Sequence, residues 1–150
     1  MVESLKKNKI LVTGGAGYIG SVLVPELLRL GHEVVVIDSF LHNQSSLLDC
    51  CRYKTFKMIR GDARDKNLVS KYIKDMDFII PLAGIVSAPS CDKDPLMATS
   101  TNLEAIKMLL ELRQPEQKFI FPNTNSGYGM GQKDIFCDET TPLNPISLYG

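Results

Sequence analysis

The chain has 150 residues, and 44% of them are hydrophobic, which is enough to build the core of one domain. Its 17 basic and 17 acidic side chains cancel, so we expect neither a nucleic-acid partner nor binding to an anionic membrane surface. The lysine-rich start leads into no apolar segment long enough for a signal peptide or a membrane span. Four cysteines without CxxC spacing favour a reduced, cytoplasmic chain, and no residue spacing indicates a metal site.

Short apolar runs alternate along the chain with segments of helical periodicity. The runs lie at residues 9–13, 33–38, 55–60, 77–82 and 118–122, and helical spacing occurs at residues 19–30, 66–74 and 94–113, with a weaker candidate at 44–51. Most runs are apolar on both faces, as are strands of a parallel sheet that helices cover on both sides. The alternation predicts an α/β fold with a doubly wound parallel sheet, followed after residue 122 by a long polar loop.

Four glycines stand between the first expected strand and the first expected helix, in the segment TGGAGYIG. Gly14, Gly17 and Gly20 recur at every third position, and Gly15, Gly17 and Gly20 satisfy the spacing G-x-G-x-x-G. In this context glycine permits a sharp turn, close approach of the backbone to a pyrophosphate, and tight packing of helix on strand. The start of the helix then offers free amides and a positive dipole end to phosphates. The motif indicates a dinucleotide site, although a glycine-rich turn without a ligand has the same spacing.

Carboxylates at the ends of the second and third strands strengthen this interpretation. Asp38 follows Gly20 by eighteen residues, where a carboxylate can accept hydrogen bonds from both hydroxyls of the adenine-side ribose. It favours NAD over NADP, because a 2′-phosphate would meet a like charge and no arginine follows closely. Asp62, after Gly61, is placed to meet the adenine. The alternatives are that Asp38 only ends a strand and that Gly-Asp is ordinary turn chemistry.

TGGAGYIG, Asp38, Gly61-Asp62 and Leu82-Ala83-Gly84 occur in an order that resembles the extended short-chain dehydrogenase/reductase family, and within it the NAD-dependent sugar-nucleotide epimerases and dehydratases. The resemblance runs from residue 9 to residue 150. It implies that residues 1–150 are a Rossmann-type NAD-binding domain. The NAD contacts it implies come from Gly14, Gly17, Tyr18, Ile19, Gly20, Asp38, Asp62, Ala63, Leu82, Ala83, Gly84, Asn102 and Tyr149. For Asn102, a surface or capping role is the alternative.

The same resemblance implies two catalytic hydroxyls. Thr124 lies four residues before Tyr128-Gly129, where the family carries Ser or Thr, and Tyr149 matches the tyrosine of the family's Tyr-x-x-x-Lys pair. The lysine position lies beyond Gly150, so we expect a longer parent protein that supplies it together with a substrate domain. Either hydroxyl could instead belong to an ordinary loop, and Ser126 competes with Thr124 because the glycine-rich loop leaves open which of them faces the substrate.

In the chemistry that the resemblance implies, tyrosinate removes a proton from a sugar hydroxyl while NAD accepts a hydride. A tyrosine with its ordinary pKa near 10 is a poor base, so nearby cations must favour its anion. The keto intermediate is reduced again from its other face, or first loses water. A reductase or decarboxylase of the same family and a non-catalytic NAD(H)-binding sensor or scaffold are the alternatives. We expect the parent to be a homodimer that acts on a nucleotide sugar, and the 150-residue chain alone to bind NAD weakly without turnover.

Overall fold

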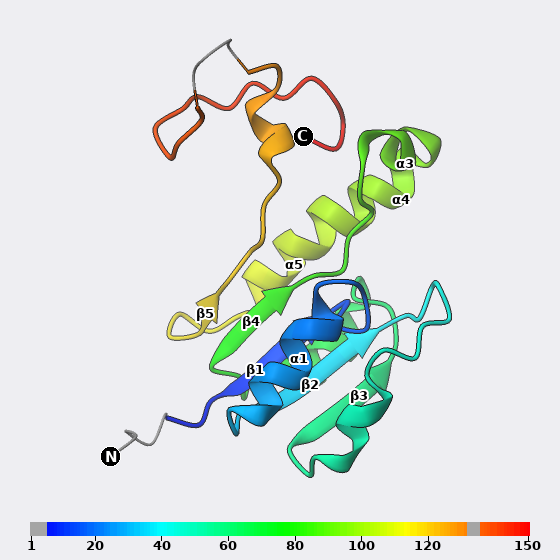
Figure 1. Cartoon of the computed structure of the whole chain (residues 1–150), viewed down its shortest axis with the longest axis vertical. Helices are drawn as coiled ribbons and strands as arrows, with labels where there is room; N and C mark the ends of the chain where they lie inside the picture. The colour runs from blue at the N-terminus through cyan, green and yellow to red at the C-terminus, as the bar shows by residue number, and fades with distance from the viewer. Residues whose placement is uncertain (1–5, 132–135) are drawn as a thin grey trace.

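A computed structural model describes residues 6–131 and 136–150 of the chain (Figure 1). Within these residues five strands alternate with helices; η2 is a π-helical turn, and η1 and η3 are short 3₁₀ helices. The elements in chain order are β1 (Lys9–Thr13), α1 (Gly20–Arg29), β2 (Glu33–Asp38), η1 (Leu48–Arg52), β3 (Phe56–Arg60), α2 (Lys66–Ile73), β4 (Phe78–Pro81), α3 (Ala88–Lys93), α4 (Pro95–Thr99), η2 (Ser100–Glu104), α5 (Ala105–Leu112), β5 (Lys118–Phe119) and η3 (Asn125–Tyr128). In this described part of the chain, no helix has the length and apolar character that crossing a bilayer requires.

The strands form one parallel sheet in the order β3-β2-β1-β4-β5. The chain winds outward from β1 to β3 on one side, then crosses back to β4 and β5 on the other. Thr13 at the end of β1 is in register with Ile37 of β2 and with Pro81 of β4. The carboxyl ends of these three strands are therefore level, and the winding direction reverses between β1 and β4. A crevice at that position is where ligands bind in open α/β sheets.

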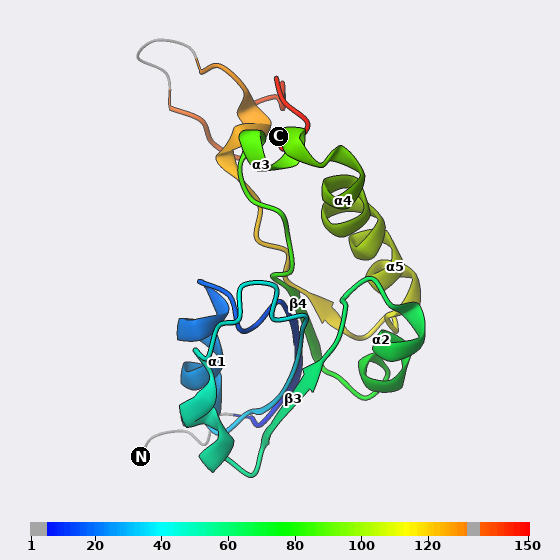
Figure 2. The ribbon, with the colours of Figure 1, turned by 90° about the vertical axis from the view of Figure 1, so that its right-hand side faces the viewer.

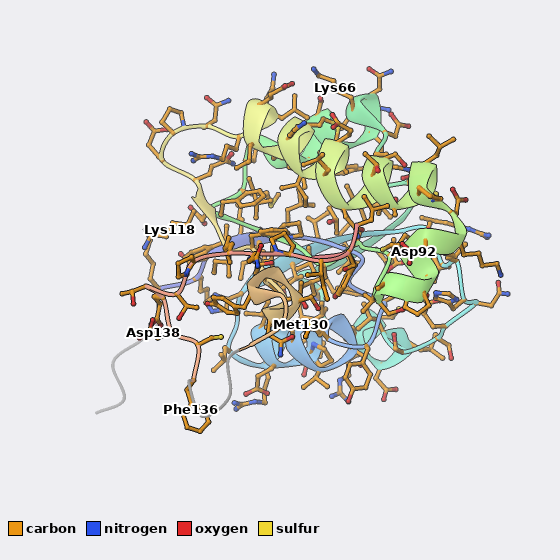
Figure 3. All side chains as sticks on the ribbon, turned by 90° about the horizontal axis from the view of Figure 1, so that it is seen from above. Lys66, Asp92, Lys118, Met130, Phe136 and Asp138 are labelled. Atoms are coloured by element: carbon orange, nitrogen blue, oxygen red, sulfur yellow. The ribbon has the colours of Figure 1, made fainter. Side chains whose placement is uncertain are left out.

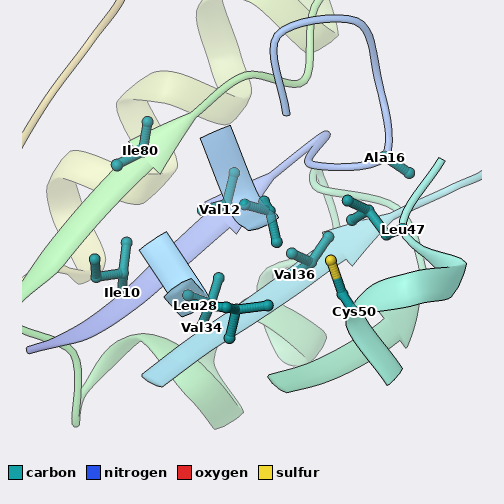
Figure 4. Close-up of a cluster of buried hydrophobic side chains, with 10 residues drawn as sticks. Ile10, Val12, Ala16, Leu28, Val34, Val36, Leu47, Cys50 and Ile80 are labelled. Carbon is teal, nitrogen blue, oxygen red and sulfur yellow. The ribbon is translucent and has the colours of Figure 1, made fainter. Parts of the chain in front are cut away.

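Helices cover both faces of the sheet, with α1 and η1 on one side and α2 and α5 on the other (Figure 2). Val12 of β1 packs in the cluster on the α1 side, with Leu28 and Cys50 (Figure 4), and its neighbour Leu11 packs on the opposite side with Leu109. Successive side chains of a strand point to opposite faces, so a strand covered on both faces must be apolar at every position. The predicted doubly wound parallel sheet is confirmed.

Two strands match their predicted bounds, but β5 is shorter than the predicted run 118–122. Ile120 still donates its N–H to the carbonyl oxygen of Ile79, at 2.9 Å. The next ladder bond would need an N–H from Pro81, which proline lacks. The prediction for β5 is therefore wrong in length, because a residue of the neighbouring strand ends the ladder.

The predicted single helix over residues 94–113 is also wrong in detail. It is divided into α4, the π-helical turn η2 and α5, and the turn falls on the polar patch around Asn102. The short helix α3 was not predicted, since six residues that include Pro89 show little periodicity. The weak candidate at 44–51 matches only in part, because the helix observed there is the 3₁₀ helix η1 at Leu48–Arg52.

Beyond β5 the chain leaves the sheet and continues past the carboxyl ends of the strands (Figure 1). Apart from η3 its described residues are irregular, as the composition predicts. Asn144 donates its N–H to the carbonyl oxygen of Gly127 at 2.9 Å, which folds the last residues back onto η3. Phe136 points away from the rest of the molecule and is 96% exposed (Figure 3).

Candidate active site

Two adjoining clefts lie at the carboxyl ends of the strands. The first cleft, of about 150 Å³, is lined by residues that include Gly17, Asp38 and Asp62. The second cleft, of about 290 Å³, is lined by residues that include Thr124 and Tyr149. Residues 82–85, which follow β4, line both clefts and form their shared wall. The site therefore lies at the sheet position where the winding direction reverses.

The glycine turn packs against this wall. Gly14 has a φ of 70°, and its N–H donates to the carbonyl oxygen of Ile37 at 2.8 Å. A Cβ at Gly14 would lie 2.4 Å from the backbone nitrogen of Ala83, and one at Gly20 would lie 2.0 Å from the carbonyl oxygen of Gly15. Gly17 differs, since its nearest described atom is the Gly14 carbonyl oxygen at 3.2 Å. Gly14 and Gly20 are thus required for packing, whereas Gly17 keeps the cleft wall free of a side chain.

The start of α1 is open to solvent. Tyr18 is 95% exposed and Ile19 is 55% exposed, and among the described residues their N–H groups make no hydrogen bond. Free amides at a helix N-terminus are suited to binding phosphate. Both residues therefore offer a free backbone amide to a ligand, and Ile19 also lines the second cleft.

Asp38 is buried, 6% exposed, and ties the glycine turn to the loop after β2. Its Oδ2 accepts from the N–H of Ala16 at 2.9 Å, and its Oδ1 accepts from the N–H of Phe40 at 2.7 Å. Ser46 donates its hydroxyl to the carbonyl oxygen of Ala16 at 2.6 Å. Ala16 is therefore held through both its N–H and its carbonyl group. Each oxygen of a carboxylate has two acceptor positions, so Asp38 can serve this structural role and still accept from ribose hydroxyls.

Asp62, Ala63 and Arg64 line the first cleft one strand farther from the glycine turn, after β3. Hydrogen bonds from the Arg64 side chain hold the pKa of the Asp62 carboxyl below its usual value, although burial opposes this shift. Asp62 is therefore ionised at neutral pH and can accept hydrogen bonds from a ligand.

Asn102, on the π-helical turn, clamps the shared wall. Its Oδ1 accepts from the N–H of Ile85 and its Nδ2 donates to the carbonyl oxygen of Ile85, both at 2.8 Å. Asn102 also lines the second cleft, and the neighbouring Thr101 lines the first. The Oγ1 of Thr101 is buried and has no hydrogen-bond partner among the described residues.

The structure brings Thr124 and Tyr149 into the same cleft, although 25 positions separate them. Thr124 caps η3, where its Oγ1 accepts from the N–H of Ser126 and donates to the Ser126 hydroxyl, both at 3.2 Å. Ser126 lies outside the residues that line the second cleft. This favours Thr124 over Ser126 as the hydroxyl that faces the cleft.

Sequence reasoning missed Arg64, Thr101 and Ser46. Arg64 gave one local signal, a cation two positions after Asp62. Ser46 and Thr101 gave none beyond their residue type, since only the fold brings Ser46 to Ala16 and places Thr101 in the wall of the first cleft.

A parallel sheet of this order, with a tight glycine turn after β1 and an acidic residue at the end of β2, defines a Rossmann-type dinucleotide-binding domain. Its clefts fit a dinucleotide, because Gly17 keeps the wall open and Asp38 retains acceptor positions. The chain belongs to the NAD dependent epimerase/dehydratase family, whose pattern it matches over residues 10–150.

Known proteins similar to this chain include several UDP-sugar epimerases. The chain is 35% identical over 146 residues to the UDP-glucose 4-epimerase of Lactobacillus helveticus, covering 95% of this chain and 43% of that protein. It superposes with a TM-score of 0.85 and 27% identity on UDP-N-acetylglucosamine 4-epimerase from Methanobrevibacter ruminantium in complex with UDP-N-acetylmuramic acid, covering 97% of this chain and 46% of that one. Thermus thermophilus UDP-glucose 4-epimerase in complex with NAD gives a TM-score of 0.78 and 32% identity, covering 94% of this chain and 46% of that one. The chain spans less than half the length of these relatives.

Proposed function

We propose that this chain is the NAD-binding domain of a longer epimerase or dehydratase that acts on a nucleotide-linked sugar. One observation carries the proposal: the cleft with Asp38 and the cleft with Thr124 and Tyr149 share the wall formed by residues 82–85. A dinucleotide lying across that wall has its adenosine half in the first cleft and its nicotinamide half in the second. The named relatives favour a 4-epimerase of UDP-sugars within this class.

The first cleft supplies groups for each part of the adenosine half. Gly17 lets the backbone approach the pyrophosphate, Gly14 and Gly20 keep the turn tightly packed, and the amides of Tyr18 and Ile19 at the start of α1 donate to the phosphates. Asp38 accepts from the ribose hydroxyls, which excludes a 2′-phosphate by charge. Asp62 and Ala63 contact the adenine, and the shared wall of Leu82, Ala83 and Gly84 continues toward the nicotinamide.

The second cleft supplies the groups that move protons. Bound NAD supplies the hydride acceptor and, later, the hydride donor. Tyr149 removes the proton from the sugar hydroxyl as its carbon is oxidised, and returns it when the keto sugar is reduced from the other face. When its hydroxyl turns from Ser126 toward the cleft, Thr124 donates a hydrogen bond to the same sugar oxygen, and Asn102 holds the wall that both clefts share.

We infer that the parent forms a homodimer through the helix composed of α4, η2 and α5. Leu96, Leu103 and Leu110 recur every seven residues on its exposed side and are 84%, 47% and 45% exposed, whereas Leu109 is 1% exposed. Apolar side chains at this spacing suit packing against another helix. Leu103→Glu in the parent is expected to yield a monomer in size-exclusion chromatography with light scattering. The control Leu48→Glu, at a 72% exposed apolar position of η1, should leave the dimer intact.

The parent protein, expressed from the complete reading frame, tests the enzyme proposal. With NAD it should interconvert UDP-sugars that differ at C4, detected by chromatography of the products. Tyr149→Phe should lower kcat by about 10²–10⁴-fold without loss of bound NAD, because the variant lacks only the proton-transferring group. A parent that binds NAD but turns over no nucleotide sugar supports the sensor or scaffold alternative instead.

A further inference from the structure

Arg64 joins the first cleft to the π-helical turn. Its Nη1 donates to the Oγ of Ser100 at 2.9 Å, and the same nitrogen lies 3.1 Å from the Sδ of Met97. Ser100 in turn donates its hydroxyl to the carbonyl oxygen of Met97 at 3.0 Å, so its oxygen is oriented to accept from Arg64. The other edge of the guanidinium faces Asp62. Arg64 is thus anchored at both ends across 36 positions of sequence.

The contacts between Arg64 and Asp62 occupy most of the carboxylate. Oδ1 accepts from the backbone N–H of Arg64 at 2.9 Å and from its Nε at 3.0 Å, while Oδ2 accepts from Nε at 3.0 Å and from Nη2 at 2.6 Å. Three N–H groups therefore meet a carboxylate that has roughly four acceptor positions. The Nε–H is shared between the two oxygens, which leaves acceptor capacity on a carboxyl side chain that is 45% exposed, and the paired guanidinium fixes the plane of the carboxylate.

The order of the strands indicates which part of a dinucleotide reaches Asp62. The glycine turn follows β1, Asp38 ends β2, and Asp62 follows β3, the strand at the outer edge on that side. Phosphate, ribose and base follow one another in the adenosine half in the same order. The base is thus the part that lies beside Asp62.

We infer that Arg64 is a positioning residue that presents one acceptor of Asp62 to the exocyclic amino group of adenine, and so selects adenine over bases that carry a carbonyl there. The inference rests on the proposed NAD site. An amino group donates to the remaining acceptor, whereas a carbonyl oxygen at the same place would face the carboxylate with like polarity. The guanidinium fork is essential, because a lysine ammonium cannot bind both carboxylate oxygens in one plane and also reach Ser100.

The test uses the 150-residue chain and two ligands, NAD and nicotinamide hypoxanthine dinucleotide, in which a carbonyl replaces the adenine amino group. Amide NMR titrations give both dissociation constants and show that each variant is folded. The wild type should bind NAD about tenfold more tightly than the hypoxanthine analogue, the ratio expected for one charge-assisted hydrogen bond. Arg64→Met and Arg64→Lys should both lower this ratio below about threefold, mainly by lowering the affinity for NAD.

Arg29→Met is the matched control, because Arg29 also pairs with a carboxylate, that of Glu26, but lies on the exposed surface of α1. It should retain the wild-type ratio. If the wild type prefers NAD and both Arg64 variants keep that preference, the positioning role is refuted while the NAD site stands. If only Arg64→Lys keeps the wild-type preference for NAD, a positive charge is sufficient at this position, and the requirement for the guanidinium fork is refuted. If the wild type binds neither dinucleotide, the proposed function and this inference fail together.

Discussion

The turn after β1 has no room for a side chain at Gly14. Its φ of 70° costs an L-residue about 1–2 kcal/mol. An added Cβ would also lie 2.4 Å from the backbone nitrogen of Ala83 and 2.7 Å from the carbonyl carbon of Leu82. These are backbone atoms of the shared wall, so relief requires the ends of β1 and β4 to separate, at a further cost of about 1–3 kcal/mol. We expect Gly14→Ala to destabilise the chain by about 2–5 kcal/mol.

Thermal unfolding followed by circular dichroism measures this loss. In a chain of this size it corresponds to a decrease in Tm of about 4–20 °C. Gly31→Ala is the matched control, because Gly31 also has a positive φ, of 87°, but its nearest described neighbour is the flexible Lys7 Cε at 3.8 Å. The control should lose only the conformational part, about 1–2 kcal/mol. Equal losses in the two variants would refute the argument from close approach.

Gly17→Ala separates binding from folding in the same turn. The nearest described atom to its Cβ would be the Gly14 carbonyl oxygen at 3.2 Å, so the change in the free energy of unfolding should stay below about 1 kcal/mol. The methyl group would nevertheless stand in the wall of the first cleft, where the pyrophosphate approaches the backbone. NAD affinity in an NMR titration should fall at least about tenfold. A variant that folds normally and binds normally contradicts the assignment of this wall to the pyrophosphate.

Three further substitutions test other contacts by urea denaturation. Asp38→Asn should cost about 1–3 kcal/mol and weaken NAD binding, because an amide cannot accept at both positions where the carboxylate meets backbone N–H groups. Gln117→Leu should cost a similar amount, about 1–3 kcal/mol, since its Nε2 donates to carbonyl oxygens after α2, including that of Met76 at 2.6 Å. Arg64→Met should reduce stability at neutral pH, because Arg64 lowers the pKa of Asp62 from its ordinary 3.8, and the difference from wild type should shrink as the pH falls below that value.

The parts of the fold predicted from sequence are those with a local cause. The sequence predicts β2 with its observed bounds because residues 34–37 are all apolar, between Glu33 and the terminal Asp38. The glycine turn was predicted because its spacing reflects contacts among neighbouring residues and the adjacent strand end. In both cases the signal lies within the segment itself, although the close approach of Ala83 to Gly14 comes from the fold.

The parts that were missed have distant causes. β5 stops because Pro81, in another strand, cannot donate the next ladder bond. Arg64 finds Ser100, and Ser46 finds Ala16, across 36 and 30 positions of sequence. A single sequence contains no local record of such pairs, so they emerge only once the sheet order has brought the loops together.

The helix beside the clefts shows how one sequence pattern serves both packing and binding. Its inward stripe runs through Ala98, Thr101, Asn102, Ala105 and Leu109, at positions i, i+3, i+4, i+7 and i+11. Such a stripe is ordinarily apolar throughout. Here the two polar members fall on the π-helical turn and line the two clefts, and π-helical turns are frequent at functional sites. The departure from the apolar pattern therefore marks the site.

The two polar members should respond to substitution with opposite signs. Asn102 satisfies both backbone groups of Ile85, so Asn102→Leu should destabilise the chain by about 1–3 kcal/mol. Thr101 buries a hydroxyl oxygen without a partner in the described structure, so the nearly isosteric Thr101→Val should leave the stability unchanged or increase it. If that hydroxyl serves a bound ligand, Thr101→Val should also weaken NAD binding in the NMR titration. A marked loss of stability in Thr101→Val would show that the hydroxyl has a structural partner. Its burial would then be explained by the fold and would give no support to a role in binding a ligand.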